Sequence, residues 1–161
     1  MTEEKKSITL VVFSGDLDKA LAAFNIAVGA ASMGMEVSMF FTFWGLNIIK
    51  KNEGPIKTKG LKRKMMNIMD RGGSKRLHAS KFHMMGIGTG MMKTMMKDIR
   101  FPQLEELMAL AKQLNVKFIA CTTSMGLFGL DKDAFIPGVD SYEGVAAYLG
   151  EATQSKVNLF I

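Results

Sequence analysis

The feature that most limits the fold is a short apolar run, ITLVVF at residues 8–13, followed at once by a helical pattern. The run is rich in β-branched residues, as expected of a strand buried on both faces of a parallel sheet. From Leu17 to Gly34 apolar residues recur at helical spacing, and Asp16 is suited to cap the start. Residues 37–43 then predict a second strand. A strand, a helix and a strand joined by short loops predict a right-handed βαβ unit.

The same alternation of strands and helices returns in the second half of the chain. Pro102 stands where a helix would begin. The later elements are predicted as a helix at 103–115, a strand at 116–121, a short helix within 124–130, an ambiguous strand at 135–138, a helix at 142–152 and a strand at 156–161. This order predicts an α/β fold, a three-layer α/β/α sandwich with a mostly parallel sheet of about five strands.

Length and residue usage limit the classes of protein to consider. A chain of 161 residues suffices for one core, so we expect a single domain over residues 1–161. No apolar run is long enough to cross a bilayer, and the polar start MTEEKKSITL lacks the apolar stretch of a secretory signal, so we expect a cytoplasmic protein. Cys121 is the single cysteine and there are two histidines, which excludes an intramolecular disulfide and the usual zinc clusters. We expect a free thiol, with no metal and no cofactor.

Residues 54–97 differ from their surroundings and are interpreted as an insert. Between residues 50 and 100 there are fourteen Lys or Arg and three Asp or Glu, a balance of +11, whereas the rest of the chain has seven and twelve, a balance of −5. Nine of the 15 methionines lie in the same stretch. Because methionine is flexible, such a segment suits a surface that adapts to partners. It is equally consistent with a helical hairpin that has its own small core, and both rank above a membrane-surface role.

Nucleic acid is not an expected partner of this basic segment. Phe82 is its one aromatic residue before Phe101, so stacking platforms for bases are scarce, and no nucleic-acid motif is present. A basic docking face for an acidic protein fits the composition better.

Cys121 occupies the position in the sequence that most favours chemistry. It is the last residue of a predicted buried strand, and ligands gather at the carboxyl ends of parallel strands. Thr122, Thr123 and Ser124 follow and can cap a helix whose free N–H groups would favour a thiolate. A buried, inert structural thiol is the competing interpretation, and the local pattern does not separate the two.

A second cluster of interest follows the second predicted strand. The segment FFTFWGLN at residues 40–47 contains Trp44, the single tryptophan, and ends at Asn47. At the carboxyl edge of the sheet these side chains would either wall a pocket beside Cys121 or cover the end of the core.

Four segments taken in order resemble the DsrE/DsrF-like family. They are FFTFWGLN, the insert with KFHMMGIGTGMMKTMMKD, the cysteine segment KFIACTTSMGLFGL and the final GVAAYLGEATQSKVNLFI. The resemblance covers residues 8–161 and is greatest to the branch with a long insertion between the second and third strands. It implies a flavodoxin-like fold, homo-oligomers and a role in cytoplasmic sulfur trafficking.

The resemblance also implies a role for the cysteine. Cys121 would carry sulfane sulfur as a persulfide, received from rhodanese-like donors or exchanged with small carriers such as TusA. Thr122, Thr123 and Ser124 would then stabilise the anion, and Trp44 and Asn47 would shape the pocket. The second cysteine of some family members is missing here, which leaves delivery to a partner thiol as the simpler route and leaves the label of enzyme open. The alternative is a non-catalytic ligand-binding or assembly module with a structural cysteine.

Overall fold

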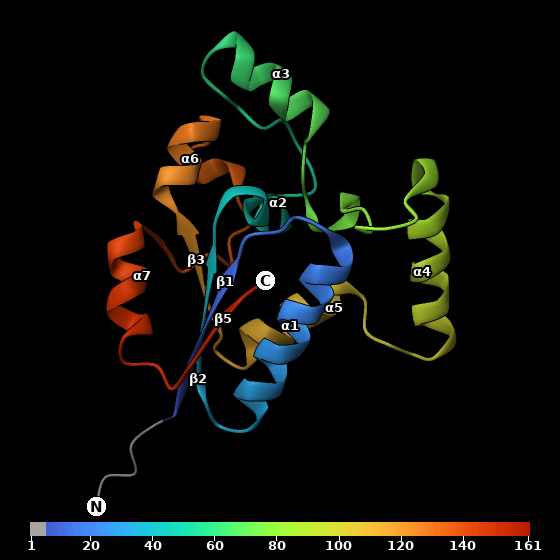
Figure 1. Ribbon diagram of the computed structural model, residues 1–161. Helices are drawn as coiled ribbons and strands as arrows, with labels where there is room; N and C mark the ends of the chain where they lie inside the picture. Colours follow the sequence, from blue (N-terminus) through green and yellow to red (C-terminus); the bar gives the residue numbers. More distant parts are fainter. Residues whose placement is uncertain (1–5) are drawn as a thin grey trace, which may run out of the picture.

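The computed structural model describes residues 6–161 and contains one five-stranded sheet (Figure 1). The strands are β1 (Ser7–Val12), β2 (Glu36–Phe41), β3 (Lys117–Cys121), β4 (Ser141–Glu143) and β5 (Val157–Phe160). Their order is β4-β3-β2-β1-β5, and every neighbouring pair is parallel. The predicted α/β class with a parallel sheet is confirmed.

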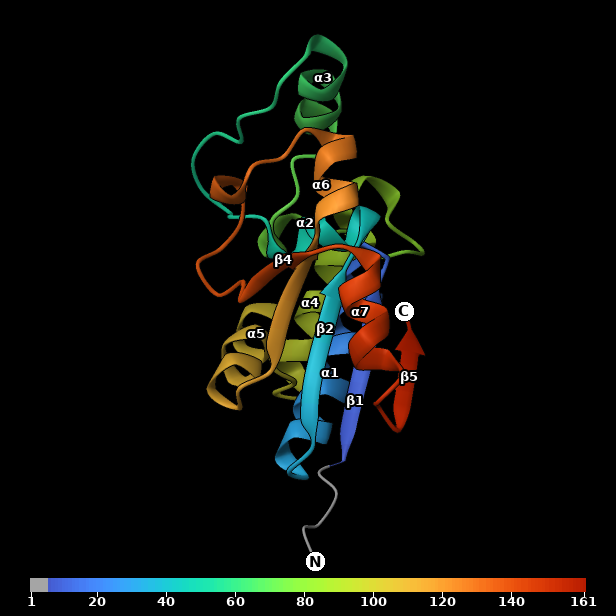
Figure 2. The same cartoon turned by 90° about the vertical axis from the view of Figure 1, so that its left-hand side faces the viewer.

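Helices cover the two faces of the sheet unequally. The helices are α1 (Leu17–Ser32), α2 (Leu46–Ile49), α3 (Leu61–Met69), α4 (Ile87–Asp98), α5 (Leu104–Gln113), α6 (Thr122–Phe128) and α7 (Val145–Ala152). α1 and α5 pack side by side on one face, and α7 lies on the other (Figures 1 and 2). The placement of these helices follows from the right-handedness of the connections between parallel strands. α1 and α5 connect strands that step in one direction across the sheet, from β1 to β2 and from β2 to β3, whereas α7 connects β4 to β5 in the opposite direction and so lies on the other face.

The main core lies under α1 and α5. Phe118 of β3 makes edge-on ring contacts with Phe24 and Phe41, at centroid distances of 5.5 and 5.6 Å. The opposite face carries a much smaller buried cluster, in which Phe40, Ile119 and Cys121 are covered by a partly buried Tyr148. The strand period of two therefore sends Phe118 into the large core and Cys121 to the thinly covered face.

Two sequence predictions about strands need correction. The second strand ends at Phe41 and not at residue 43, because Phe43 has a φ of 47° and starts a 3₁₀ turn. The fourth strand is β4 and not residues 135–138. Pro137 cannot donate to a ladder, and Phe135 makes only an isolated bridge to Lys50.

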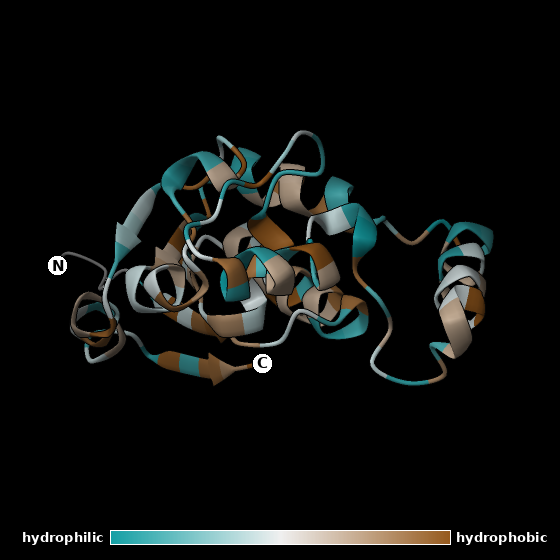
Figure 3. Ribbon diagram, turned by 90° about the horizontal axis from the view of Figure 1, so that it is seen from above, coloured by the Kyte–Doolittle hydropathy of each residue, from teal (hydrophilic) through white to brown (hydrophobic). Residues whose placement is uncertain are grey.

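The insert forms two separate helices, and the helical hairpin is wrong. α3 stands above the carboxyl edge of the sheet, whereas α4 lies at the side of the molecule, where Met92 and Met96 pack against the main core (Figures 1 and 3). In α4 only Thr89 and Met96 are buried. In residues 6–161 no helix combines the length and the apolarity required for a membrane crossing.

Candidate functional site

β2 and β3 are neighbours whose chains leave the sheet toward different sides. After β3 the chain enters α6, which lies on the side of α7, while after β2 it passes through α2 toward the side of α5 (Figure 1). In open α/β sheets, ligands bind in the crevice outside the carboxyl ends of the strands. The two segments that meet here are residues 42–47 and 121–124.

Cys121 ends β3 and also occupies the N-cap position of α6, with no loop between strand and helix. The residue is 4 % exposed, whereas Thr122 and Thr123 beside it are exposed. The thiol therefore lies just below the surface, with its side chain on the α7 face.

A hydroxyl pair links the ends of β2 and β3 next to this thiol. The hydroxyl oxygens of Thr42 and Ser124 lie 2.9 Å apart, and the backbone N–H of Phe43 donates to Ser124 Oγ at 3.0 Å. Ser124 Oγ accepts the hydrogen bond from the Phe43 amide through a lone pair, so the single hydroxyl proton of Ser124 remains available for another acceptor. The network supplies hydroxyl protons at the base of α6.

These groups lower the pKa of Cys121. Burial raises the pKa of the thiol, but hydrogen bonds from the Ser124 amide, the Thr42 and Ser124 hydroxyls and the Thr123 amide outweigh it and lower the pKa below the ordinary cysteine value. Each of these donors stabilises the charged sulfur, which is the form that acts as a nucleophile. The arrangement thus favours a thiolate without a neighbouring histidine.

The predicted anion-stabilising residues contribute unequally. Ser124 acts through both its amide and its hydroxyl, and Thr123 acts through its amide alone. Thr122 is exposed, and within residues 6–161 it is not among the groups that shift the thiol pKa. Thr42 was missed, although it directly follows β2 in an extended conformation, so that its side chain points to the same side as that of Phe40 two residues earlier.

Trp44 and Asn47 line two cavities at this edge of the sheet. In the described chain Cys121 lines neither cavity. The Trp44 ring contacts Phe128 at a centroid distance of 5.4 Å, and the buried Asn47 donates from Nδ2 to Asp70 at 2.6 Å. Trp44 and Asn47 therefore line cavities next to the insert, and these cavities are separate from the site of the Cys121 sulfur.

The larger of the two cavities, about 370 Å³, lies at the carboxyl end of β1. Its turn closes on itself, since the Ser14 hydroxyl donates to Asp16 at 2.9 Å and the Asp16 amide donates back to Ser14 at 3.1 Å. Lys19 forms an ion pair with the same carboxylate at 2.9 Å. Asp16 is the N-cap residue of α1, as the sequence predicts, but its carboxylate makes no capping hydrogen bond to the helix, because Ser14 and Lys19 engage it.

The smaller cavity is lined by a buried lysine, Lys50. Lys50 is 4 % exposed, and its ammonium donates to Asn67 Oδ1 at 3.2 Å. Burial lowers the pKa of Lys50 to about 8, against a raising effect of Asp70 and with a further lowering effect of Arg71.

Lys50 is expected to make stability depend on pH in the alkaline range. Between its folded pKa of about 8 and its ordinary value of 10.5, the unfolded chain holds a proton that the folded chain has lost, so stability rises with pH. Relative to Lys50→Met, the wild-type protein should gain up to about 3 kcal/mol as pH rises from 8 to 10.5, and should lose this gain as pH falls back from 10.5 to 8. Urea unfolding of both proteins at several pH values measures the difference between their free energies of unfolding. Lys62→Met, on an exposed position of α3, should follow the wild type, and parallel curves for wild type and Lys50→Met would contradict the prediction.

Comparisons with known proteins extend over nearly the whole chain. The family model described as DsrE/DsrF/DrsH-like family matches residues 4–160. YrkE of Bacillus subtilis (strain 168) is 44% identical over 162 residues and 100% of both chains. The sulfur carrier protein DsrE2 of Allochromatium vinosum is 36% identical, over 98% of this chain and 99% of that protein.

Two solved structures share the fold at low sequence identity. The ychN protein from E. coli has a TM-score of 0.60 at 9% identity, covering 97% of this chain and 99% of that chain. MTH1491 from Methanobacterium thermoautotrophicum has a TM-score of 0.53 at 11% identity, covering 96% and 99%. These likenesses concern the fold alone.

Proposed function

The chain belongs to the DsrE/DsrF/DrsH-like family, and from this premise we propose that it is a sulfur carrier that holds sulfane sulfur as a persulfide on Cys121. A relative named as a sulfur carrier protein is 36% identical over nearly the full length of both chains. The observation that carries the proposal is the position of Cys121 at the N-terminus of α6, next to the paired hydroxyls of Thr42 and Ser124, because these amide and hydroxyl donors lower the pKa of the thiol. A purely structural cysteine needs no such donors, because a neutral thiol packs as a small apolar group.

The transfer is a balanced exchange of one sulfur atom. The Cys121 thiolate attacks the outer sulfur of a donor persulfide R–S–SH; a new S–S bond forms, the donor S–S bond breaks, and R–S⁻ leaves. The product is Cys–S–SH, and no external oxidant or reductant is consumed. Delivery is the reverse reaction, in which an acceptor thiolate attacks the outer sulfur and Cys121 leaves as the thiolate that its hydrogen bonds stabilise.

We propose that the sulfur is exchanged with thiols of other proteins. Cys121 is the single cysteine, so no internal disulfide resolves the persulfide. We propose rhodanese-like donors and small TusA-like carriers as partners, in a reducing compartment such as the cytoplasm. The basic insert offers them a surface of exposed methionines, among them Met69, Met85 and Met91.

Self-association would use the thinly covered face. Val145 and Leu149 of α7 are 57% and 51% exposed, and Phe160 of β5 is 71% exposed. Because parallel sheets are normally covered on both faces, we propose that a second copy of the chain covers this one.

Access to the sulfur requires movement of α7. Tyr148 stacks on Phe40 at a centroid distance of 5.0 Å and packs against the cluster that contains Cys121. None of the eight residues of α7 is buried. A helix with so little burial opens at low cost in free energy, which lets a partner thiol reach a residue that is 4 % exposed.

Tyr148→Ala should therefore speed labelling of Cys121 several-fold. The substitution removes the ring that covers the cluster while it leaves the hydroxyl network untouched. The measurement is the rate of native thiol labelling by a small alkylating reagent at fixed pH. Leu149→Ala, which truncates an exposed neighbour, is the matched control and should label like the wild type. An unchanged rate in Tyr148→Ala would show that the sulfur is reached by another route.

The proposal itself is tested by loading the protein with polysulfide. Mass spectrometry of intact protein and of its peptides should find an added sulfur atom on Cys121. A folded protein that stays unmodified would favour the alternative, a ligand-binding or assembly module in which Cys121 only packs.

A further inference from the structure

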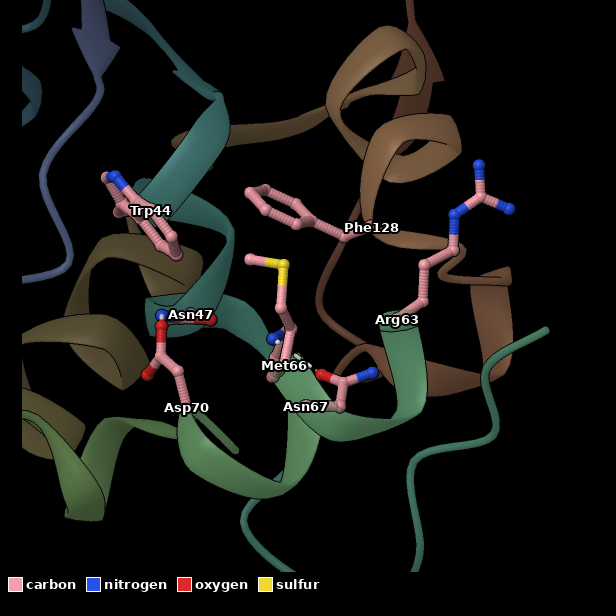
Figure 4. Close-up of a pocket in the computed structure, with 8 residues that line it drawn as sticks. Trp44, Asn47, Arg63, Met66, Asn67, Asp70 and Phe128 are labelled. Carbon is pink, nitrogen blue, oxygen red and sulfur yellow. Dashed lines mark hydrogen bonds between the residues drawn. The ribbon is translucent and has the colours of Figure 1, made fainter. Parts of the chain in front are cut away.

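A small polar cavity under α3 lies apart from the thiol. Its volume is about 20 Å³ and its walls include Trp44, Met66 and Phe128 (Figure 4). Lys50 and Asn67 contribute polar groups to it. A cavity needs roughly 10–15 Å³ to hold one water molecule, so this one has room for a single water-sized particle.

The floor of the cavity is built from buried polar side chains. Asn47, Lys50 and Asn67 are 6%, 4% and 8% exposed. They come from two segments, since Asn47 and Lys50 lie in and directly after α2, and Asn67 lies on α3. Polar groups at this depth are normally hydrogen-bonded, so each donor that lacks a partner calls for an explanation.

The cavity has more donors than acceptors. Asn47 Nδ2 donates one hydrogen bond to Asp70 Oδ2. Lys50 has three N–H donors and gives one to Asn67 Oδ1 at 3.2 Å. That bond fixes the orientation of the amide, and within residues 6–161 the amide nitrogen of Asn67 is buried and has no hydrogen-bond partner.

The charges point the same way. Two cations, Lys50 and Arg63, line the cavity against one carboxylate, Asp70, whose Oδ2 is already hydrogen-bonded to Asn47. A buried ammonium that is hydrogen-bonded to a neutral amide oxygen remains poorly compensated. A negative particle beside Lys50 and the Asn67 amide would supply both the missing charge and the missing acceptor.

We propose that this cavity binds one small monovalent anion, a halide or hydrosulfide. The size excludes sulfate and thiosulfate as fully enclosed ligands. The walls of Trp44, Met66 and Phe128 suit a polarisable anion that needs few hydrogen bonds. The exposed side chains of Arg63 and Met66 mark the entrance. This site does not depend on Cys121.

The single tryptophan gives a direct readout, since Trp44 lines the cavity. Bromide, a heavy-atom quencher, is titrated at constant ionic strength with sulfate as the balancing anion. We expect a saturable component of quenching, which chloride and hydrosulfide displace. The concentrations of chloride and of hydrosulfide that displace bromide show which of these two anions the cavity binds more tightly.

Variants separate binding in the cavity from collisional quenching. Lys50→Met keeps the length of the side chain without its charge and should weaken the saturable component at least about tenfold. Asn67→Leu, which removes the unpartnered amide, should weaken it as well. Lys62→Met, on an exposed position of the same helix, should bind like the wild type. Quenching that is linear in bromide and equal in wild type and Lys50→Met would overturn the proposal.

Cys121→Ser distinguishes this proposal from the sulfur-carrier function. Unchanged competition by hydrosulfide in this variant supports the cavity, whatever the outcome of sulfur loading. If hydrosulfide acts on the wild type but not on Cys121→Ser, the response belongs to the thiol and hydrosulfide is removed as a ligand of the cavity.

Discussion

Cys121→Ser should abolish sulfur loading by polysulfide. A serine hydroxyl is not ionised at neutral pH and forms no stable bond to sulfane sulfur, so the variant has no acceptor. Mass spectrometry after incubation with polysulfide should find one added sulfur atom on the wild-type protein and none on the variant. Transfer to a small thiol acceptor should fall to the rate of the uncatalysed exchange.

The loading experiment also requires evidence that Cys121→Ser is folded, which thermal unfolding supplies. Serine is close in size to cysteine and is a favoured residue at the N-cap position that Cys121 occupies, so thermal unfolding should change little. Thr123→Ala serves as the matched control, since it alters an exposed side chain beside the thiol, and it should load like the wild type. Equal loading of Cys121→Ser and wild type would place the added sulfur elsewhere and remove the basis of the proposed carrier.

Ser124→Ala should slow native labelling of Cys121 about tenfold at neutral pH. The Ser124 hydroxyl is one of the donors that lower the thiol pKa, and it also holds the Thr42 hydroxyl in place at 2.9 Å. Loss of both donors is expected to raise the pKa of Cys121, and a higher pKa leaves a smaller fraction of the thiol ionised at neutral pH. Labelling rates measured from acidic to alkaline pH give the pKa of each protein directly.

The sign and the controls of this prediction are specific. The wild-type profile should have its midpoint below the ordinary pKa of cysteine, and the Ser124→Ala profile should move to higher pH while both reach the same plateau. Thr42→Val should move it less, because the Ser124 hydroxyl remains. Thr123→Ala should not move it, since Thr123 donates through its backbone. A Ser124→Ala profile that coincides with the wild type would mean that the hydroxyls do not bond to the sulfur.

Much of the fold was predictable because its elements are locally encoded. The buried strand at β1, the helical spacing of α1 and the strand at β3 each span consecutive residues whose periodicity differs between helix and strand. β4 was misplaced because it is a three-residue edge strand, too short to show a period, and because Pro137 stands beside an apolar run that only resembles a strand. The separation of α3 from α4 depends on what each packs against, which composition does not specify.

The candidate site was predictable in part. That Cys121 precedes the N-terminus of a helix follows from neighbours in the chain, as do the amides of Thr123 and Ser124. Thr42 was missed because it lies 82 residues away from Ser124 in the sequence. The two meet only because β2 and β3 are paired, with Phe41 opposite Ala120.

The sequence alone determined a parallel α/β chain with one thiol at the carboxyl end of a buried strand, because periodicity and capping act between residues a few positions apart. Only the tertiary structure decided which hydroxyl faces that thiol and that Tyr148 covers it. Only the tertiary structure decided, likewise, that Trp44 and Asn47 belong to a lysine-containing cavity under α3. These contacts depend on the order of strands in the sheet and on where the insert folds back, and both are set by burial of the whole chain.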